Sequence, residues 1–137
     1  MKKSSEKPYG TKYLVTDHAI YQKKDSIIYI TFRENLNLNA RTAQAIVAER
    51  LAFQANAPYP VICDVTTIKS IDEEARMYLA SRGSNQIEVV ALVSEASTVY
   101  EMGMLYKAFN SPKAPTEVFS TAEEAENYIK QLKNHKE

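Results

Sequence analysis

The first third of the chain shows the pattern of β-strands. Its strongest run, residues 27–32, is dense in β-branched and aromatic side chains, and two shorter runs, residues 13–15 and 19–21, precede it. Runs of this composition, separated by a few polar residues, are typical of strands joined by short turns. The pattern therefore predicts an antiparallel meander at the start of the chain.

Helical periods alternate with strands from residue 39 onward. Apolar residues recur three and four positions apart between Ala43 and Leu51, with Asn39 as the expected N-cap and Pro58 closing the segment. The strands expected after this helix comprise residues 61–65, 87–93 and 117–119. Three further helices are expected, each with one apolar core face. The core face of the second helix comprises Ile71, Ala75, Tyr78 and Leu79, and that of the third comprises Met102, Leu105, Tyr106 and Phe109. The core face of the last helix comprises Ala122, Ala125, Ile129 and Leu132.

These later helices begin with the capping-box pattern, a Ser or Thr followed three residues later by Glu. The boxes start at Ser70, Thr98 and Ser120. The order of elements is then βββαβαβαβα, which favours right-handed crossovers and a mixed sheet, antiparallel at its start and parallel afterwards. The sequence therefore predicts an α/β fold with four helices.

The chain is expected to form one domain. It has 137 residues, 45% of them hydrophobic, and a chain of this length buries roughly two-thirds of its unfolded surface without disulfide or metal staples. Residues 1–9, rich in Lys and Ser, are predicted to be a flexible tail, and residues 10–134 a single domain. No stretch approaches the roughly 18 to 20 apolar residues of a membrane span, so we expect a cytoplasmic protein without stable membrane insertion.

Composition and charge argue against several functions. The 17 basic residues balance the 17 acidic ones, so no net field attracts nucleic acid. One cysteine and two histidines are too few for a structural zinc site. The three glycines, Gly10, Gly83 and Gly103, lie too far apart to form a phosphate-binding loop. We therefore expect no nucleic-acid binding, no metal and no cofactor.

The sequence also predicts no catalytic residues. A Ser-His-Asp or Cys-His site would have to use His18, because His135 lies near the end of the chain. A surface histidine in a tight turn after Asp17 is the simpler interpretation. Cys63 lies within an apolar strand, where a thiol behaves as a small buried hydrophobe with an ordinary or raised pKa.

A polar segment leads from the strand at residues 61–65 into the next helix, where open α/β sheets usually place functional loops. Its candidate partner-binding residues are Asp64, Thr66, Thr67, Ser70, Asp72 and Glu73. Two interpretations stay open. In one, Ser70 caps the helix and Glu73 completes its box, while the carboxylates gain roughly 0.3–1 kcal/mol each from the helix dipole. In the other, the segment is a loop that faces a partner.

Residues 99–109 are apolar around more of the expected helix than one core-facing stripe requires. Gly103 within it costs about 0.5–1 kcal/mol relative to alanine, which indicates that another group approaches closely. Either the methionines fill irregular core space, or Tyr100, Met104 and Tyr106 form a dimer contact or the wall of a pocket for a small apolar ligand.

Residues 61–72 resemble the strand-loop-helix of STAS domains, the anti-anti-sigma family, in which Asp-Ser-Ser-Gly opens the helix. Asp72 matches the aspartate, whereas Glu73 and Glu74 stand at the two serines and Ala75 at the glycine. The phosphorylation switch of that family therefore cannot operate at Glu73. Its carboxylate carries about one negative charge where phosphoserine carries about 1.5 to 2.

Over roughly residues 13–132 the chain resembles the SpoIIAA-like (STAS/SEC14-type) family of small bacterial proteins, most visibly at residues 108–113 and 116–125. The resemblance implies a SpoIIAA-like fold and a non-enzymatic regulatory or protein-interaction module, as a homodimer with an unidentified protein partner. Thr66, Thr67 and Ser70 remain as candidate phosphate acceptors. The SEC14-type label implies an alternative, a carrier or sensor of a small apolar ligand such as a lipid or quinone-like molecule.

Overall fold

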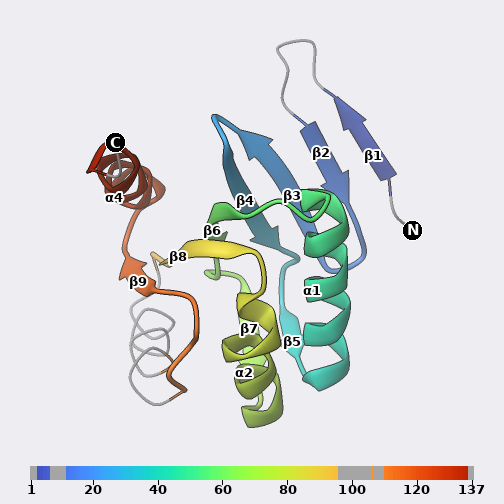
Figure 1. Cartoon of the computed structure of the whole chain (residues 1–137). Helices are drawn as coiled ribbons and strands as arrows, with labels where there is room; N and C mark the ends of the chain where they lie inside the picture. Colours follow the sequence, from blue (N-terminus) through green and yellow to red (C-terminus); the bar gives the residue numbers. More distant parts are fainter. Residues whose placement is uncertain (1–2, 7–11, 96–105, 107–109, 136–137) are drawn as a thin grey trace.

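The computed structural model describes residues 3–6, 12–95, 106 and 110–135, which form a large and a small β-sheet with helices on both faces of the large one (Figure 1). The strands are β1 (Lys3–Glu6), β2 (Lys12–Val15), β3 (Ala19–Lys24), β4 (Ile27–Phe32), β5 (Leu36–Leu38), β6 (Tyr59–Asp64), β7 (Ile68–Ile71), β8 (Ile87–Val93) and β9 (Thr116–Phe119). The helices in this part of the chain are α1 (Ala40–Gln54), α2 (Glu73–Ala80), α4 (Ala122–His135) and the short 3-10 helix η1 (Arg82–Ser84).

The large sheet has the strand order β1-β2-β3-β4-β6-β8-β9. Its first four strands pair antiparallel, and β4, β6, β8 and β9 pair parallel. Asp25 and Ser26 join β3 to β4 with positive φ angles of 54° and 62°, as a two-residue hairpin turn requires when its twist matches that of the strands. The predicted α/β fold with its mixed sheet is confirmed.

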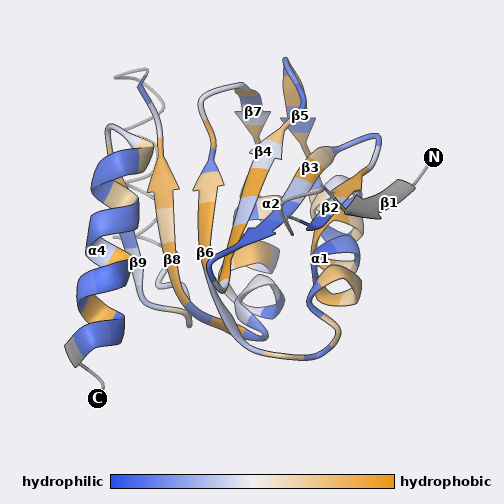
Figure 2. Cartoon of the chain, turned by 90° about the horizontal axis from the view of Figure 1, so that it is seen from above, coloured by the Kyte–Doolittle hydropathy of each residue, from blue (hydrophilic) through white to orange (hydrophobic). Residues whose placement is uncertain are grey.

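Side chains of the central strands alternate between two helical layers, because successive residues of a strand point to opposite faces. In β4, Ile28 and Ile30 pack with Phe53 of α1, whereas Ile27 packs with Ile129 of α4. Figure 2 shows the apolar character of β6 and β8, which lie at the centre of the parallel part of the sheet. Strands covered on both faces need nearly continuous apolar runs, and this is why their sequences are so hydrophobic.

The predicted flexible tail and the predicted number of helices differ from the structure. Lys3–Glu6, expected within a flexible tail, form β1 and pair with β2. An edge strand pairs through backbone N–H and C=O groups. The polar side chains of this segment therefore show no pattern from which the strand could be predicted. The described residues contain three α-helices rather than four. The remaining predicted helix, with its core face at Met102, Leu105, Tyr106 and Phe109, lies outside the described residues except for Tyr106.

The small sheet changes the predicted start of α2. β5 and β7 pair in parallel with Asn37 opposite Ser70, and Ser70 Oγ donates to Asn37 Oδ1 at 2.6 Å. Ser70 is therefore a strand residue, and its prediction as the N-cap was wrong. Asp72 caps α2 and accepts a hydrogen bond from the Ala75 N–H at 2.9 Å. A capping box is a local pattern, whereas the pairing that displaces it joins residues 33 positions apart.

The other described helix starts lie at or beside their predicted positions. Asn39 caps α1 as predicted, accepting from the Thr42 N–H at 2.9 Å. At α4 the Glu124 N–H donates to Thr121 Oγ1, and the Ser120 N–H donates to Glu124 Oε1. The cap is therefore Thr121, one residue later than predicted. The box at Thr98 lies outside the described residues.

Replacement of the two candidate caps of α2 tests its observed start. Asp72→Ala is expected to lower the free energy of unfolding by about 1 kcal/mol, because it removes the N-cap acceptor. Ser70→Ala is expected to lower it by less than about 0.5 kcal/mol, because Ser70 is exposed. Chemical denaturation measures both losses, and a larger loss for Ser70→Ala would contradict the cap assignment.

Candidate ligand-binding cavity

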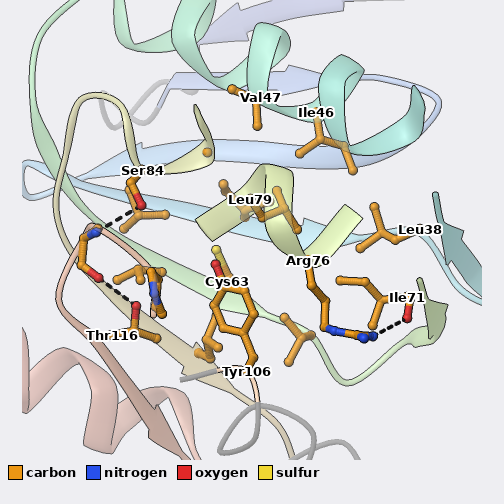
Figure 3. Close-up of a pocket in the computed structure, with 18 of the residues that line it drawn as sticks. Leu38, Ile46, Val47, Cys63, Ile71, Arg76, Leu79, Ser84, Tyr106 and Thr116 are labelled. Atoms are coloured by element: carbon orange, nitrogen blue, oxygen red, sulfur yellow. Dashed lines mark hydrogen bonds between the residues drawn. The ribbon is translucent and has the colours of Figure 1, made fainter. Parts of the chain in front are cut away.

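A cavity of about 530 Å³ lies between the large sheet and the layer of α1 and α2 (Figure 3). The sheet side of its wall includes Ile30, Phe32, Val61, Cys63, Val65, Val90 and Leu92. The opposite side includes Ile46, Val47 and Arg50 of α1, Arg76 and Leu79 of α2, and Leu38 of the small sheet. Most of these side chains are aliphatic. Cavities of roughly 300–1,000 Å³ with mainly apolar walls are typical of small-molecule sites.

Among the described elements, the helices cover the two faces of the sheet unequally, and the cavity lies on the face of α1 and α2. α4 packs over β6, β8 and β9, whereas on the opposite face α1 packs over β3 and against α2. α2 spans about 12 Å, less than the roughly 23 Å of β8. Side chains of β6 and β8 that point away from α4, such as Val61, Val90 and Leu92, therefore line the cavity.

Two ionisable groups on the wall are held in their neutral forms. Burial raises the pKa of the Cys63 thiol to about 12, and burial also raises the pKa of the Tyr106 hydroxyl above its ordinary value. Desolvation disfavours the charged form of each group. Figure 3 shows both side chains at the cavity. At neutral pH the wall therefore presents a thiol and a phenol rather than their anions.

Cys63 is expected to react slowly with alkylating reagents in the native protein. A rise of its pKa from 9.0 to about 12 lowers the thiolate fraction at pH 8 by roughly a factor of 1,000. We expect iodoacetamide to modify the native protein at least about 100-fold more slowly than the urea-unfolded protein. Mass spectrometry gives both rates, and a native rate within about tenfold of the unfolded one would contradict the prediction.

Arg50 is a buried charged residue on the cavity wall, with 3% of its surface exposed. Its guanidinium donates to Gln54 Oε1, to the Gly83 carbonyl at 3.1 Å and to the Asn85 carbonyl at 2.9 Å. These bonds tie α1 to the segment between α2 and β8. Desolvation by burial lowers the pKa of Arg50 below its ordinary value. Its three acceptors carry no charge, and in the described part of the chain no carboxylate forms an ion pair with it.

Charged side chains of α2 mark where the cavity reaches the surface. Glu73, exposed in the first turn of α2, and the half-buried Arg76 both line the cavity. Arg76 Nη1 donates to the Ile71 carbonyl at 2.9 Å, the hydrogen bond drawn in Figure 3. The cavity therefore has a polar rim beside the start of α2.

The predicted apolar-ligand residues are described only in part. Tyr106 lines the cavity, whereas Tyr100 and Met104 lie outside the described residues. The aliphatic wall itself comes from strands and helices that the sequence assigned to the core.

The six predicted partner-binding residues lie between the carboxyl end of β6 and the first turn of α2, and five of them make hydrogen bonds within the chain. Asp64 Oδ1 accepts from the Thr66 N–H at 3.0 Å, and Thr67 Oγ1 donates to the Phe32 carbonyl at 3.0 Å. Ser70 bonds to Asn37, and Asp72 caps α2. The bonds give these residues structural roles that differ from the predicted capping box, because Asp72 rather than Ser70 caps α2. The sixth residue, Glu73, lies on the cavity rim.

Sequence reasoning missed a buried carboxylate beside His18. Glu49, with 4% of its surface exposed, accepts hydrogen bonds from Thr16 Oγ1 at 2.8 Å, Tyr21 OH at 2.7 Å and His18 Nδ1 at 3.0 Å. Burial raises the pKa of Glu49, but these hydrogen bonds outweigh burial and hold it below its ordinary value. Only the positions of these charged residues in the helical pattern could have indicated that they are buried. Glu49 and Arg50 stand three residues after Ile46 and Val47, on the apolar face of α1.

The described residues offer neither a metal cluster nor a helix that could span a membrane. No cluster of three or more His, Cys, Asp or Glu side chains suited to a metal ion occurs among them. None of their helices has both the length and the apolar character needed to cross a membrane.

The architecture is that of SpoIIAA-like proteins. A similar solved structure is that of an uncharacterized protein of the DUF3478 family with a SpoIIAA-like fold, from Shewanella loihica PV-4. The match has a TM-score of 0.56 at 12% identity and covers 83% of this chain and 96% of that one. The predicted SpoIIAA-like resemblance is confirmed at the level of the fold.

The chain belongs to the family described as domain of unknown function DUF7793, whose model matches residues 21–133. No curated protein sequence matches the chain significantly.

Proposed function

We propose that this protein is a non-enzymatic regulatory module of the STAS type that binds a small apolar ligand. The cavity of about 530 Å³ with its mainly aliphatic wall carries the proposal. Burying apolar ligand surface contributes about 25 cal/mol per Å², and this wall offers such contacts from both the sheet and the helices. The SpoIIAA-like fold supports the assignment to the STAS type.

Binding of a neutral apolar fluorescent probe, N-phenylnaphthylamine, tests the proposal. We expect saturable fluorescence enhancement with the wild-type protein. Leu79→Trp places a larger side chain on the cavity wall and is expected to weaken probe binding at least about tenfold. The matched control is Met77→Trp, because Met77 lies on the same helix with 57% of its surface exposed. No saturable binding to the wild type, or equal binding to both variants, would overturn the proposal.

A protein-interaction role is the second candidate. Glu73 lines the cavity and is also exposed at the start of α2. In this proposal a bound ligand changes the surroundings of Glu73, and a protein partner senses that change at the surface. In this proposal a protein partner contacts the start of α2 and the segment from Asp64, and the module acts as a homodimer. Native mass spectrometry of the protein purified from its own cells reports subunit number and retained ligand together. A monomer mass would contradict the dimer.

A further inference from the structure

Arg50 carries a charge in a setting where charges are rarely found without a counter-charge. It is 3% exposed and lines an otherwise mainly aliphatic cavity. Taking a cation out of water is strongly unfavourable, and buried arginines are therefore almost always paired. The neighbourhood of Arg50 should accordingly supply an anion.

The described groups around Arg50 do not supply that anion. Its hydrogen-bond acceptors are the side-chain amide of Gln54 and two backbone carbonyls. Cys63 and Tyr106, on the same cavity wall, are neutral because burial raises the pKa of each. Glu49, next to Arg50 in the sequence, instead accepts bonds from Thr16, Tyr21 and His18.

The guanidinium also has hydrogen-bonding capacity in reserve. It has five N–H groups, and the bonds to Gln54, Gly83 and Asn85 use three of them. These contacts hold the guanidinium in place on the cavity wall, so a ligand that pairs with Arg50 does not have to order its side chain. Hydrogen bonds between an ionised donor and an ionised acceptor are roughly twice as strong as neutral ones.

We propose that the cavity takes an amphipathic monoanion, a single aliphatic chain that ends in a carboxylate, with the carboxylate paired to Arg50. The aliphatic wall accommodates the chain. At the buried Arg50 one guanidinium compensates one negative charge, and a phosphate dianion there would leave excess charge in an apolar setting. Arg76, the other arginine of the wall, is half-buried at the rim and donates to the Ile71 carbonyl. The inference rests on the proposed function, because it names the ligand class of the same cavity.

The test compares three ligands of equal chain length as competitors of N-phenylnaphthylamine at pH 7. Decanoate is expected to displace the probe at a concentration at least about tenfold lower than decanol, and decylamine is expected to be weaker than decanol. Decanol as effective as decanoate would overturn the inference and leave the proposed function standing. If neither the probe nor any of the three ligands binds, the proposed function itself fails.

Two arginine variants locate the source of the preference. Arg50→Gln is first confirmed as folded by circular dichroism. In this variant the concentrations of decanol and decanoate that displace the probe are expected to lie within about twofold of each other. Arg41→Gln is the matched control, because it removes one positive charge from an exposed position of the same helix, and it should keep the wild-type ratio. Loss of the preference in Arg76→Gln but not in Arg50→Gln would overturn the assignment to Arg50. If Arg50→Gln does not fold, the inference stands or falls on whether the wild-type protein binds decanoate more tightly than decanol.

Discussion

Glu49→Ala is expected to lower the free energy of unfolding by about 3–5 kcal/mol. The carboxylate accepts three side-chain hydrogen bonds at the junction of α1 with β3 and the turn before it. Its removal leaves the buried hydroxyls of Thr16 and Tyr21 with only their longer bonds, to the Ala19 and Ile46 carbonyls at 3.3 Å, and it opens a void among buried side chains. A buried hydroxyl that loses its better acceptor costs up to about 1–3 kcal/mol. Urea denaturation measures the loss.

A matched control separates this effect from simple removal of a glutamate. Glu123→Ala removes an exposed carboxylate in the first turn of α4 and is expected to change the stability by less than about 1 kcal/mol. Tyr21→Phe removes only one of the three bonds to Glu49 and should lie between the two, at about 1–2 kcal/mol. Equal losses for Glu49→Ala and Glu123→Ala would show that the buried cluster contributes nothing.

The same carboxylate makes stability depend on pH. The pKa of Glu49 in the folded protein lies below 4.5, its ordinary value. Its contribution is therefore fully present above that value and is lost as the pH falls through the folded-state pKa. We expect the wild type to lose more stability than Glu49→Gln between about pH 6 and pH 3. Denaturation at a series of pH values tests this, and parallel pH profiles would contradict it.

Truncations on opposite faces of the sheet are expected to differ in effect. Ile129→Ala, in the layer between α4 and the sheet, is expected to lower the free energy of unfolding by about 3–5 kcal/mol. Ile129 is fully buried and packs with side chains of β6 and β8. Leu92→Ala is expected to lower it by only about 1–2 kcal/mol, because Leu92 is half-buried and faces the existing cavity.

This pair of variants also tests whether the cavity is open in solution. If the cavity were closed by tight packing, Leu92→Ala would remove as many contacts as Ile129→Ala and the two losses would be equal. Denaturation curves give the comparison directly. Probe titration of Leu92→Ala adds a second readout, because a larger cavity should still bind N-phenylnaphthylamine.

Much of the fold was predictable because its signals are local. The apolar run of β8 and the three- and four-residue spacing in α1 follow from the periods of a strand and a helix. Asn39 was identified as a cap because its side chain acts within one turn. The start of α2 was predicted too early because it depends on a distant segment. Ser70 belongs to strand β7, which forms only when β5 lies beside it.

The candidate site was predictable only in part. Tyr106 was singled out because it belongs to an unusually apolar segment, and it lines the cavity. The rest of the wall looks like core in the sequence, because the same aliphatic residues serve either purpose. In the sequence Arg50 is recognisable only as a charged residue on the apolar face of α1. Long charged side chains at such positions often reach water, so its burial could not be predicted.

The sequence by itself determined the α/β class, the switch from antiparallel to parallel strands and the SpoIIAA-like character of the chain. Each of these depends on periodicity and motif spacing, which involve residues close together along the chain. Only the tertiary structure decided that α4 covers β6 and β8 on one face while α1 and α2 leave a cavity on the other. Only it placed Arg50 on that wall and Glu49 beside His18. A cavity and a buried charge depend on how several distant elements pack together, and no single segment of sequence encodes them.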